Sequence, residues 1–257
     1  PSTGPRILEN VKDAQAGLYH ARHGNTEVLV RMLASGWDPQ RAKDKNGLNG
    51  LAWAAGYGHV DVIRILLEQK VDPESPNKEG RTALMWACRN GHLPAVKLLV
   101  ASGADLKAVT KKGINCFHWA VWGASVTVAE WLLDHGLELE SQNNSGCTAP
   151  VWAAASGSLT MCEWLLARNA DFARMNHWGH GVINKAAWHG HQHVLEWLLQ
   201  LPGLEDQLFL MDAAGKTPVE LAALPGHTNV VQYLQDWMGR RPQPLRPATS
   251  IDTSQLK

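Results

Sequence analysis

The sequence predicts an all-α protein, built as a solenoid of stacked helix-turn-helix units with short hairpin-like turns. The first observation is a period of 33 residues between glycines that lie in short polar segments: Gly47, Gly80, Gly113, Gly146 and Gly179, with Gly215 following after 36. The second observation is that an alanine follows each of these glycines by seven residues, and that a leucine pair then follows in the first five units. Such a period is typical of solenoids, whose units bury their apolar faces by stacking.

Each unit begins with the turn. A short polar residue stands three positions before the turn glycine, where its side chain is expected to bond to nearby backbone groups. These residues are Asp44, Asn77, Thr110, Asn143, Asn176 and Asp212.

The first helix of each unit follows the turn. Thr82, Thr148 and Thr217 stand where an N-cap is needed. The small alanine within this helix lets neighbouring helices approach, and the series is Ala54, Ala87, Ala120, Ala153, Ala186 and Ala222. A glycine is then expected to end the helix in the left-handed conformation, at Gly58, Gly91, Gly157, Gly190 and Gly226.

The second helix carries the leucine pairs, which predict an apolar seam. They are Leu66-Leu67, Leu98-Leu99, Leu132-Leu133, Leu165-Leu166 and Leu198-Leu199. The turn and first helix read N-K-E-G-R-T-A-L-M-W-A around Gly80 and D-A-A-G-K-T-P-V-E-L-A around Gly215. This pattern, with its 33-residue period, resembles the ankyrin repeat and its T-P-L-H-x-A signature.

The resemblance covers about Leu8 to Met238 and implies an ankyrin repeat domain of seven repeats, with flanking segments 1–7 and 239–257 expected to be disordered. The predicted repeats are 8–43, 44–76, 77–109, 110–142, 143–175, 176–211 and 212–238. In the first repeat Ala14 replaces the turn glycine, and its first helix, around residues 18–23, is expected to be one residue shorter, as in a capping repeat or the cut edge of a longer array. Leu201-Pro202-Gly203 lengthens the connection between the last two repeats.

The composition and charge of the chain indicate which partners and which compartment to expect. Lys plus Arg and Asp plus Glu both number 24, so no net charge favours nucleic acid or an anionic membrane. No apolar run reaches the roughly 18 residues of a membrane span, so no membrane insertion is expected. The four cysteines have neither disulfide-framework nor zinc-site spacing, which favours free thiols in a reducing compartment. We therefore expect a monomer in the cytoplasm, or alternatively in the nucleus.

Tryptophan is over-represented, with 12 Trp against 3 Phe and 3 Tyr. Seven of the tryptophans occupy two repeat positions, which predicts that they fill inter-repeat layers of the core. One position holds Trp53, Trp86, Trp119 and Trp152, and the other holds Trp131, Trp164 and Trp197, with Tyr233. The alternative is a partly exposed aromatic ladder, because Trp86 lies only about 60° around its helix from Arg89.

The remaining tryptophans include candidates for binding. Ankyrin-like proteins bind partners on a concave face formed by the turn tips and by the variable residues after the alanine pair. The resemblance places Trp178 at a turn tip, and Trp122 and Trp188 at the variable position. Exposed aromatic residues commonly mark interfaces.

The same mapping predicts a concave face that is basic at one end and aromatic at the other. The basic residues are Lys45, Lys78, Arg81, Arg89, Lys111 and Lys112, opposed by the single acid Glu79. The sixth repeat adds His177, His180 and His189 beside its tryptophans. The alternative is an indifferent, solvated face, since Lys and Arg are common on any surface.

Catalytic and cofactor motifs are absent from the sequence: we find no phosphate-binding loop, nucleophile elbow, zinc-protease helix or EF-hand loop. We therefore expect no enzyme activity and no cofactor. His189, His191 and His193 could converge on a zinc ion, but solvated loop histidines are the favoured interpretation. The tail from Arg241 to Pro247 also fits an R-x-x-P-x-x-P ligand of SH3-type domains, a string frequent by chance.

The resemblance implies an adaptor or scaffold that binds a protein partner on its concave face. The expected partner carries an apolar or aromatic segment next to an acidic one. The alternative is a substrate-recognition or regulatory domain of a larger enzyme or channel. Ankyrin arrays serve many partners, so the fold does not select between these functions.

Overall fold

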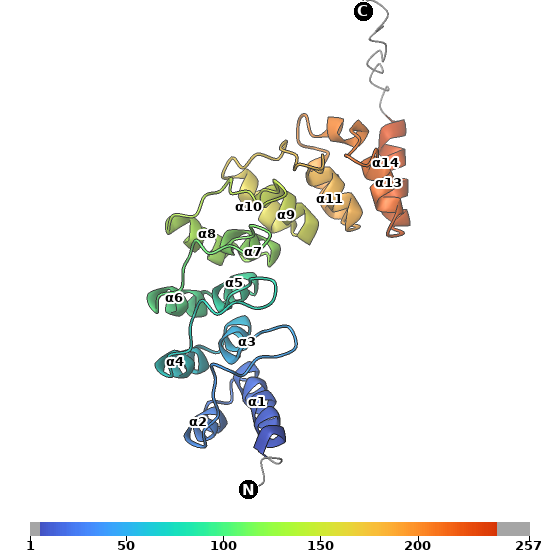
Figure 1. Ribbon diagram of the computed structural model, residues 1–257. Helices are drawn as coiled ribbons and strands as arrows, with labels where there is room; N and C mark the ends of the chain where they lie inside the picture. Colours follow the sequence, from blue (N-terminus) through green and yellow to red (C-terminus); the bar gives the residue numbers. More distant parts are fainter. Residues whose placement is uncertain (1–5, 241–257) are drawn as a thin grey trace, which may run out of the picture.

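A computed structural model describes residues 6–240, which form an arc of stacked helix pairs (Figure 1). Within this range the chain has fourteen α-helices that pair in order, and no strand. The pairs are α1 (Arg6–Arg22) with α2 (Thr26–Ala34), α3 (Gly50–Tyr57) with α4 (Val60–Glu68), α5 (Ala83–Arg89) with α6 (Leu93–Ala101), α7 (Cys116–Trp122) with α8 (Val126–Asp134), α9 (Ala149–Ser156) with α10 (Leu159–Leu166), α11 (Val182–Trp188) with α12 (Gln192–Leu198), and α13 (Pro218–Ala223) with α14 (Thr228–Gly239). The predicted all-α solenoid is confirmed.

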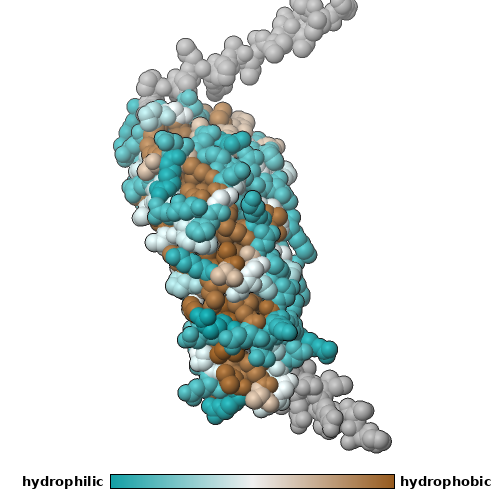
Figure 2. Space-filling model, turned by 90° about the vertical axis from the view of Figure 1, so that its left-hand side faces the viewer, coloured by the Kyte–Doolittle hydropathy of each residue, from teal (hydrophilic) through white to brown (hydrophobic). Residues whose placement is uncertain are grey.

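The helices form two layers. In Figure 1 the odd-numbered helices from α1 to α9 lie on the inner, concave side of the arc, and their even-numbered partners lie on the outer side. The signature alanines of the inner helices are fully buried between neighbours. Seen from the outer side, a band of apolar residues runs along the molecule between polar ones (Figure 2).

The polar residues of the turns bond as their chemistry predicts. The Asn77 side-chain oxygen accepts hydrogen bonds from the backbone N–H of Glu79 (3.0 Å) and of Arg81 (2.8 Å). The same pair of bonds recurs at Asp44, Asn143, Asn176 and Asp212. Neighbouring turns are also joined by backbone bonds, such as Lys78 N–H to the Asn46 carbonyl at 3.1 Å. The turns therefore form a continuous row along the array.

The helix caps are only partly as predicted. Thr217 caps α13 within a capping box, with its hydroxyl accepting from the Glu220 N–H. Thr82 and Thr148 occupy the N-cap positions of α5 and α9, but their hydroxyls make no cap bond and are buried without a partner. The capping role predicted for these two side chains is therefore wrong.

The first helix differs from the expectation. We expected a short helix at residues 18–23, but α1 spans 17 residues from Arg6 to Arg22. Its segment has no proline and lacks the turn glycine, so nothing in the backbone interrupts the helix. The helix also includes residues 6 and 7, which are the last two residues of the 1–7 segment. At the other end α14 runs to Gly239, and the predicted tail beyond Arg240 lies outside the described residues.

A 3-10 helix, η1 (Glu205–Phe209), lies in the longer connection between α12 and α13. Its Leu208 and Gln207 are buried. The Gln207 amide donates to the carbonyl of Ala173 at 3.2 Å, so the connection folds back onto the preceding repeat.

Candidate functional site

Basic and aromatic side chains meet in one hollow on the inner face. Its lining residues come from α5, α7 and α9 and from the turns that precede them: Lys78, Glu79, Arg81, Arg89, Thr110, Lys111, Lys112, Ile114, Trp119, Trp122, Asn143 and Trp152. Its volume of about 540 Å³ is in the range of ligand-binding clefts. The hollow therefore contains five of the six predicted basic residues and one of the three predicted tryptophans.

This arrangement corrects the predicted polarity of the face. We expected the basic residues at one end of the array and the aromatic residues at the other. In the structure the cations and three tryptophans interleave within the same hollow. The reason is helical spacing, because Arg89 follows Trp86, and Trp122 follows Trp119, by three residues on one helix face.

Two arginines of the hollow lie over tryptophan rings. The Arg81 guanidinium carbon is 4.4 Å from the ring centre of Trp119 and 5.4 Å from that of Trp86. Arg89 lies over the same two rings, at 5.7 Å from Trp119 and 5.5 Å from Trp86. All four distances suit cation–π attraction, which holds the guanidinium groups in place.

The tryptophan ladder is core at one position only. Trp119 is 5% exposed, whereas Trp53, Trp86 and Trp152 are partly buried. The expectation of core rings thus holds for Trp119, whereas the other three pack against the core and stay partly exposed, as in the alternative of a partly exposed ladder. The ladder forms the floor of the concave face, because a wide indole at this position extends past the slim alanine beside it.

Trp122 is held by neighbours from two further repeats. Its ring packs edge-on against Trp152, with centroids 5.7 Å apart, and against His189, at 6.1 Å. It is half-buried, so it combines packing with access to the hollow. Of the three predicted sixth-repeat histidines, His189 is the one that contacts this tryptophan.

The two other predicted tryptophans are exposed but lie outside the hollow. Trp188, the last residue of α11, is 41% exposed. Trp178, at the turn tip, is 59% exposed, and its carbonyl accepts from the Ala213 N–H beside the exposed Met211. Of the three candidate tryptophans, only Trp122 therefore lines the hollow.

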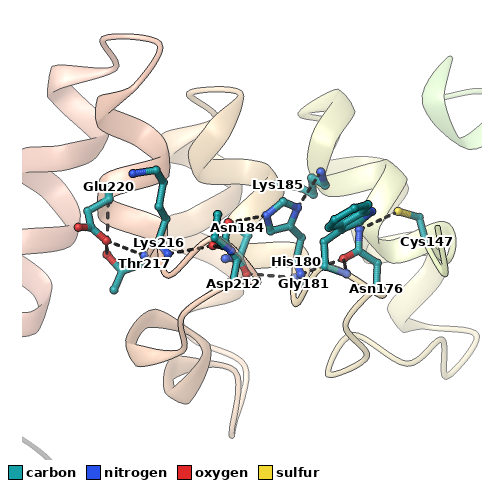
Figure 3. A network of polar contacts seen from close by, with 12 residues as sticks. Cys147, Asn176, His180, Gly181, Asn184, Lys185, Asp212, Lys216, Thr217 and Glu220 are labelled. Atoms are coloured by element: carbon teal, nitrogen blue, oxygen red, sulfur yellow. Dashed lines mark hydrogen bonds and ion pairs between the residues drawn. The ribbon is translucent and has the colours of Figure 1, made fainter.

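His180 belongs to a polar network within the protein (Figure 3). Its ring lies between Asp212, with Nε2 to Oδ2 at 2.8 Å, and Lys185, whose Nζ is 3.3 Å from Nδ1. The Lys216 N–H and the His180 ring hold the pKa of the Asp212 carboxyl below its usual value. His180 thus ties the sixth turn to the seventh, a role that its turn-tip position did not indicate.

His177 and Lys45 also lie outside the hollow. Both are exposed turn residues, and the His177 ring covers Gly146 of the preceding turn, where an added Cβ would fall 2.7 Å from its Cδ2. Within residues 6–240, no cluster of His, Cys, Asp or Glu has a metal-binding arrangement. In the same range no helix is long and apolar enough to cross a membrane.

Sequence reasoning missed Trp119 and Trp152 as site residues, because it assigned their repeat position to the core. The signal that could have found Trp119 is its spacing of three residues to Trp122 on α7, which matches that of Trp86 to Arg89 on α5, whereas Trp152 has no such neighbour. Ile114 and Asn143, which complete the lining, carry no such signal.

Comparison with known proteins agrees with the repeat pattern. A family model described as ankyrin repeats (3 copies) matches residues 18–110 and 103–176, which together exceed half of the chain. No curated protein matches the sequence. With its period, its helix pairs and this match, the chain belongs to the ankyrin repeat family.

Proposed function

We propose that this protein is an adaptor or scaffold that holds a protein partner on its concave face. Ankyrin repeats are protein–protein interaction modules. The observation that carries the proposal is the hollow, in which five cations and one carboxylate surround tryptophan rings. Tryptophan and arginine are the residues most enriched among interface hot spots. The proposal assigns binding, and no catalysis, to this face.

The exposed Trp188 extends the proposed surface beyond the hollow. An indole that is 41% exposed at a variable position of the inner helix offers apolar area to a partner. Trp122 serves both the surface and the fold, since it packs on Trp152 and His189. We therefore place the cleanest test of binding at Trp188 and treat Trp122 as a second position.

The test compares two photo-crosslinking side chains in cells, one at Trp188 and one at Lys97, which is exposed on the outer helix α6. A protein crosslinked from position 188 and not from 97 is purified, and its affinity for this chain is measured. Trp188→Ala is expected to weaken that binary affinity by about tenfold or more while leaving the thermal midpoint unchanged. Trp122→Ala is expected to weaken it as well, with a lower midpoint.

Identical crosslinked proteins from both positions would contradict the proposal. So would a purified partner that binds Trp188→Ala and wild type equally.

A further inference from the structure

The two arginines of the hollow differ in their partners. Arg81 forms an ion pair with Glu79 at 2.7 Å, in which the glutamate side chain is 64% exposed. Arg89 has no carboxylate partner among residues 6–240. Burial, and next the charge of Arg81, lower the pKa of the Arg89 guanidinium. Two cations thus lie over the same tryptophan rings, and the one exposed carboxylate beside them pairs with Arg81 alone.

Two tryptophans that line the hollow, and Trp86 beside it, carry hydrogen-bond donors without acceptors in the described part of the chain. The indole Nε1 atoms of Trp86, Trp119 and Trp152 are buried and have no partner in the described part of the chain. A buried N–H without an acceptor costs folding free energy, and most such groups in folded proteins are paired. The Nε1 atom of Trp119 is buried from solvent, so an anion in the hollow would bond to the guanidinium groups of Arg81 and Arg89 that lie over this ring, and not to its N–H.

We propose that Arg81 and Arg89 clamp one anionic side chain of an extended acidic peptide segment, which carries an apolar residue for Trp122 and Trp152. The shared chemistry is a carboxylate or phosphate oxygen, which the fork of a guanidinium binds in two parallel hydrogen bonds. This inference rests on the proposed function and specifies its partner. Glu79 keeps Arg81 in position until the incoming anion takes its place.

The positive charge of the hollow favours an acidic peptide over a neutral or cationic one. Lys78, Lys111 and Lys112 surround the arginine pair, so five cations face one glutamate, and a neutral or cationic peptide gains nothing from them. A nucleic acid would need a basic track along the backbone. Toward the C-terminal repeats the inner face continues with the exposed Trp188 and with a network in which Lys185 and His180 are joined to the Asp212 carboxylate, rather than with a row of unpaired cations.

The experiment measures binding of fluorescently labelled ten-residue peptides to the purified full chain by anisotropy. One peptide carries three glutamates and a tryptophan, a second has glutamines in place of the glutamates, and a third has one glutamate replaced by phosphoserine. The acidic peptides are expected to bind, with affinity that falls as salt rises, and the glutamine peptide is expected to bind at least about tenfold more weakly. Tighter binding of the phosphoserine peptide would identify phosphate as the preferred anion, and equal binding would identify carboxylate.

Single substitutions in the chain test where the acidic peptide binds. Arg89→Gln is expected to weaken the acidic peptide by about tenfold or more, with partial recovery in Arg89→Lys. Arg64→Gln, on the outer helix α4, removes the same charge elsewhere and is expected to change nothing. If circular dichroism shows Arg89→Gln misfolded, the exposed double variant Lys111→Gln with Lys112→Gln replaces it, with a weaker affinity and a shallower salt dependence expected.

Equal loss in Arg64→Gln and Arg89→Gln, or equal affinity for the acidic and glutamine peptides, would overturn the clamp. So would an oligothymidine that binds as tightly as the acidic peptides. If the clamp fails while position 188 still crosslinks a specific partner, the adaptor proposal stands without it. If the peptides bind and no specific partner is crosslinked, the clamp stands and the adaptor proposal falls.

Discussion

His118 stands at the histidine position of the T-P-L-H-x-A signature, and α7 places its side chain in the core. Its side chain is fully buried, with Nε2 3.1 Å from the Ser141 carbonyl and Nδ1 accepting from the Asn115 N–H at 3.3 Å. Both bonds require the neutral ring that is protonated at Nε2. Burial accordingly lowers the pKa of His118 to about 4.

We predict that this histidine makes the protein sensitive to mild acid. The unfolded chain binds a proton near the ordinary pKa of about 6.5, and the folded chain does so only near 4. Stability therefore falls as pH drops between these two values, by up to about 3 kcal/mol from this group. Urea unfolding at several pH values is expected to show the fall, and His118→Gln is expected to flatten it. An unchanged pH slope in His118→Gln would refute this origin.

At the scale of the helix, α7 ends differently from its neighbours. Gly91, Gly157 and Gly190 adopt left-handed backbone after their inner helices, with φ between 76° and 77°. In the fourth repeat Ala124 takes this conformation, at φ 56°, and the glycine stands one residue earlier. Gly123 has ordinary helical φ, but a Cβ there would overlap the carbonyl oxygen of Arg89.

The two positions predict opposite effects on the free energy of unfolding. Ala124→Gly is expected to raise it by about 0.5–1 kcal/mol, because left-handed backbone is costly for alanine and not for glycine. Gly123→Ala is expected to lower it by about 1–3 kcal/mol, because α5 and α7 must separate to admit the methyl group. Urea midpoints of both single variants test the pair. A lower midpoint for Ala124→Gly would contradict the backbone argument, and an unchanged or higher midpoint for Gly123→Ala would contradict the packing argument.

The elements were more predictable from the sequence than the site. The turn residues and the alanines recur in the second to seventh repeats and the leucine pairs in the second to sixth. Their backbone requirements are local, so turns such as that of Asn77 form as predicted. The cap bonds predicted at Thr82 and Thr148 were wrong, because both hydroxyls are buried and neither accepts a cap bond within the described residues. The long α1 departed from the pattern because Ala14 replaces the turn glycine and no proline interrupts residues 6–22.

The hollow was harder to predict because it depends on contacts between repeats. Periodicity places Trp119 and Arg81 in their own units, but the stacking of helices decides that the guanidinium of one unit lies over the indole of the next. His180 looked available at its turn tip, yet Asp212 of the following repeat bonds its ring. Trp178 and Trp188, whose neighbours are few, were placed more accurately as exposed residues.

At the scale of the whole molecule, stability is distributed along the array. Each helix pair packs on its neighbours, so the energy is close to a sum of repeat and interface contributions. Trp119 lies in the middle of the stack and is 5% exposed. It contacts Trp152 of the next repeat, with centroids 6.2 Å apart, and Arg81 of the preceding one.

We predict that Trp119→Ala lowers the free energy of unfolding by about 3–5 kcal/mol, the usual loss for a large core aromatic residue. Hydrogen exchange is expected to show the loss of protection mainly in α5, α7 and α9, with the terminal pairs little changed. Trp164→Ala, at a half-buried ring of the outer layer, serves as the comparison and is expected to cost less. A change below about 0.5 kcal/mol for Trp119→Ala would show that its ring contributes no packing.

The contact between Trp122 and His189 also governs how the arc bends. An array in which each repeat contacts only its neighbours can bend at every interface between repeats. Trp122 reaches from the fourth repeat to the sixth while resting on Trp152 of the fifth, so these three rings brace two successive joints. We therefore expect the stretch from α7 to α11 to bend less than the repeat interfaces on either side of it.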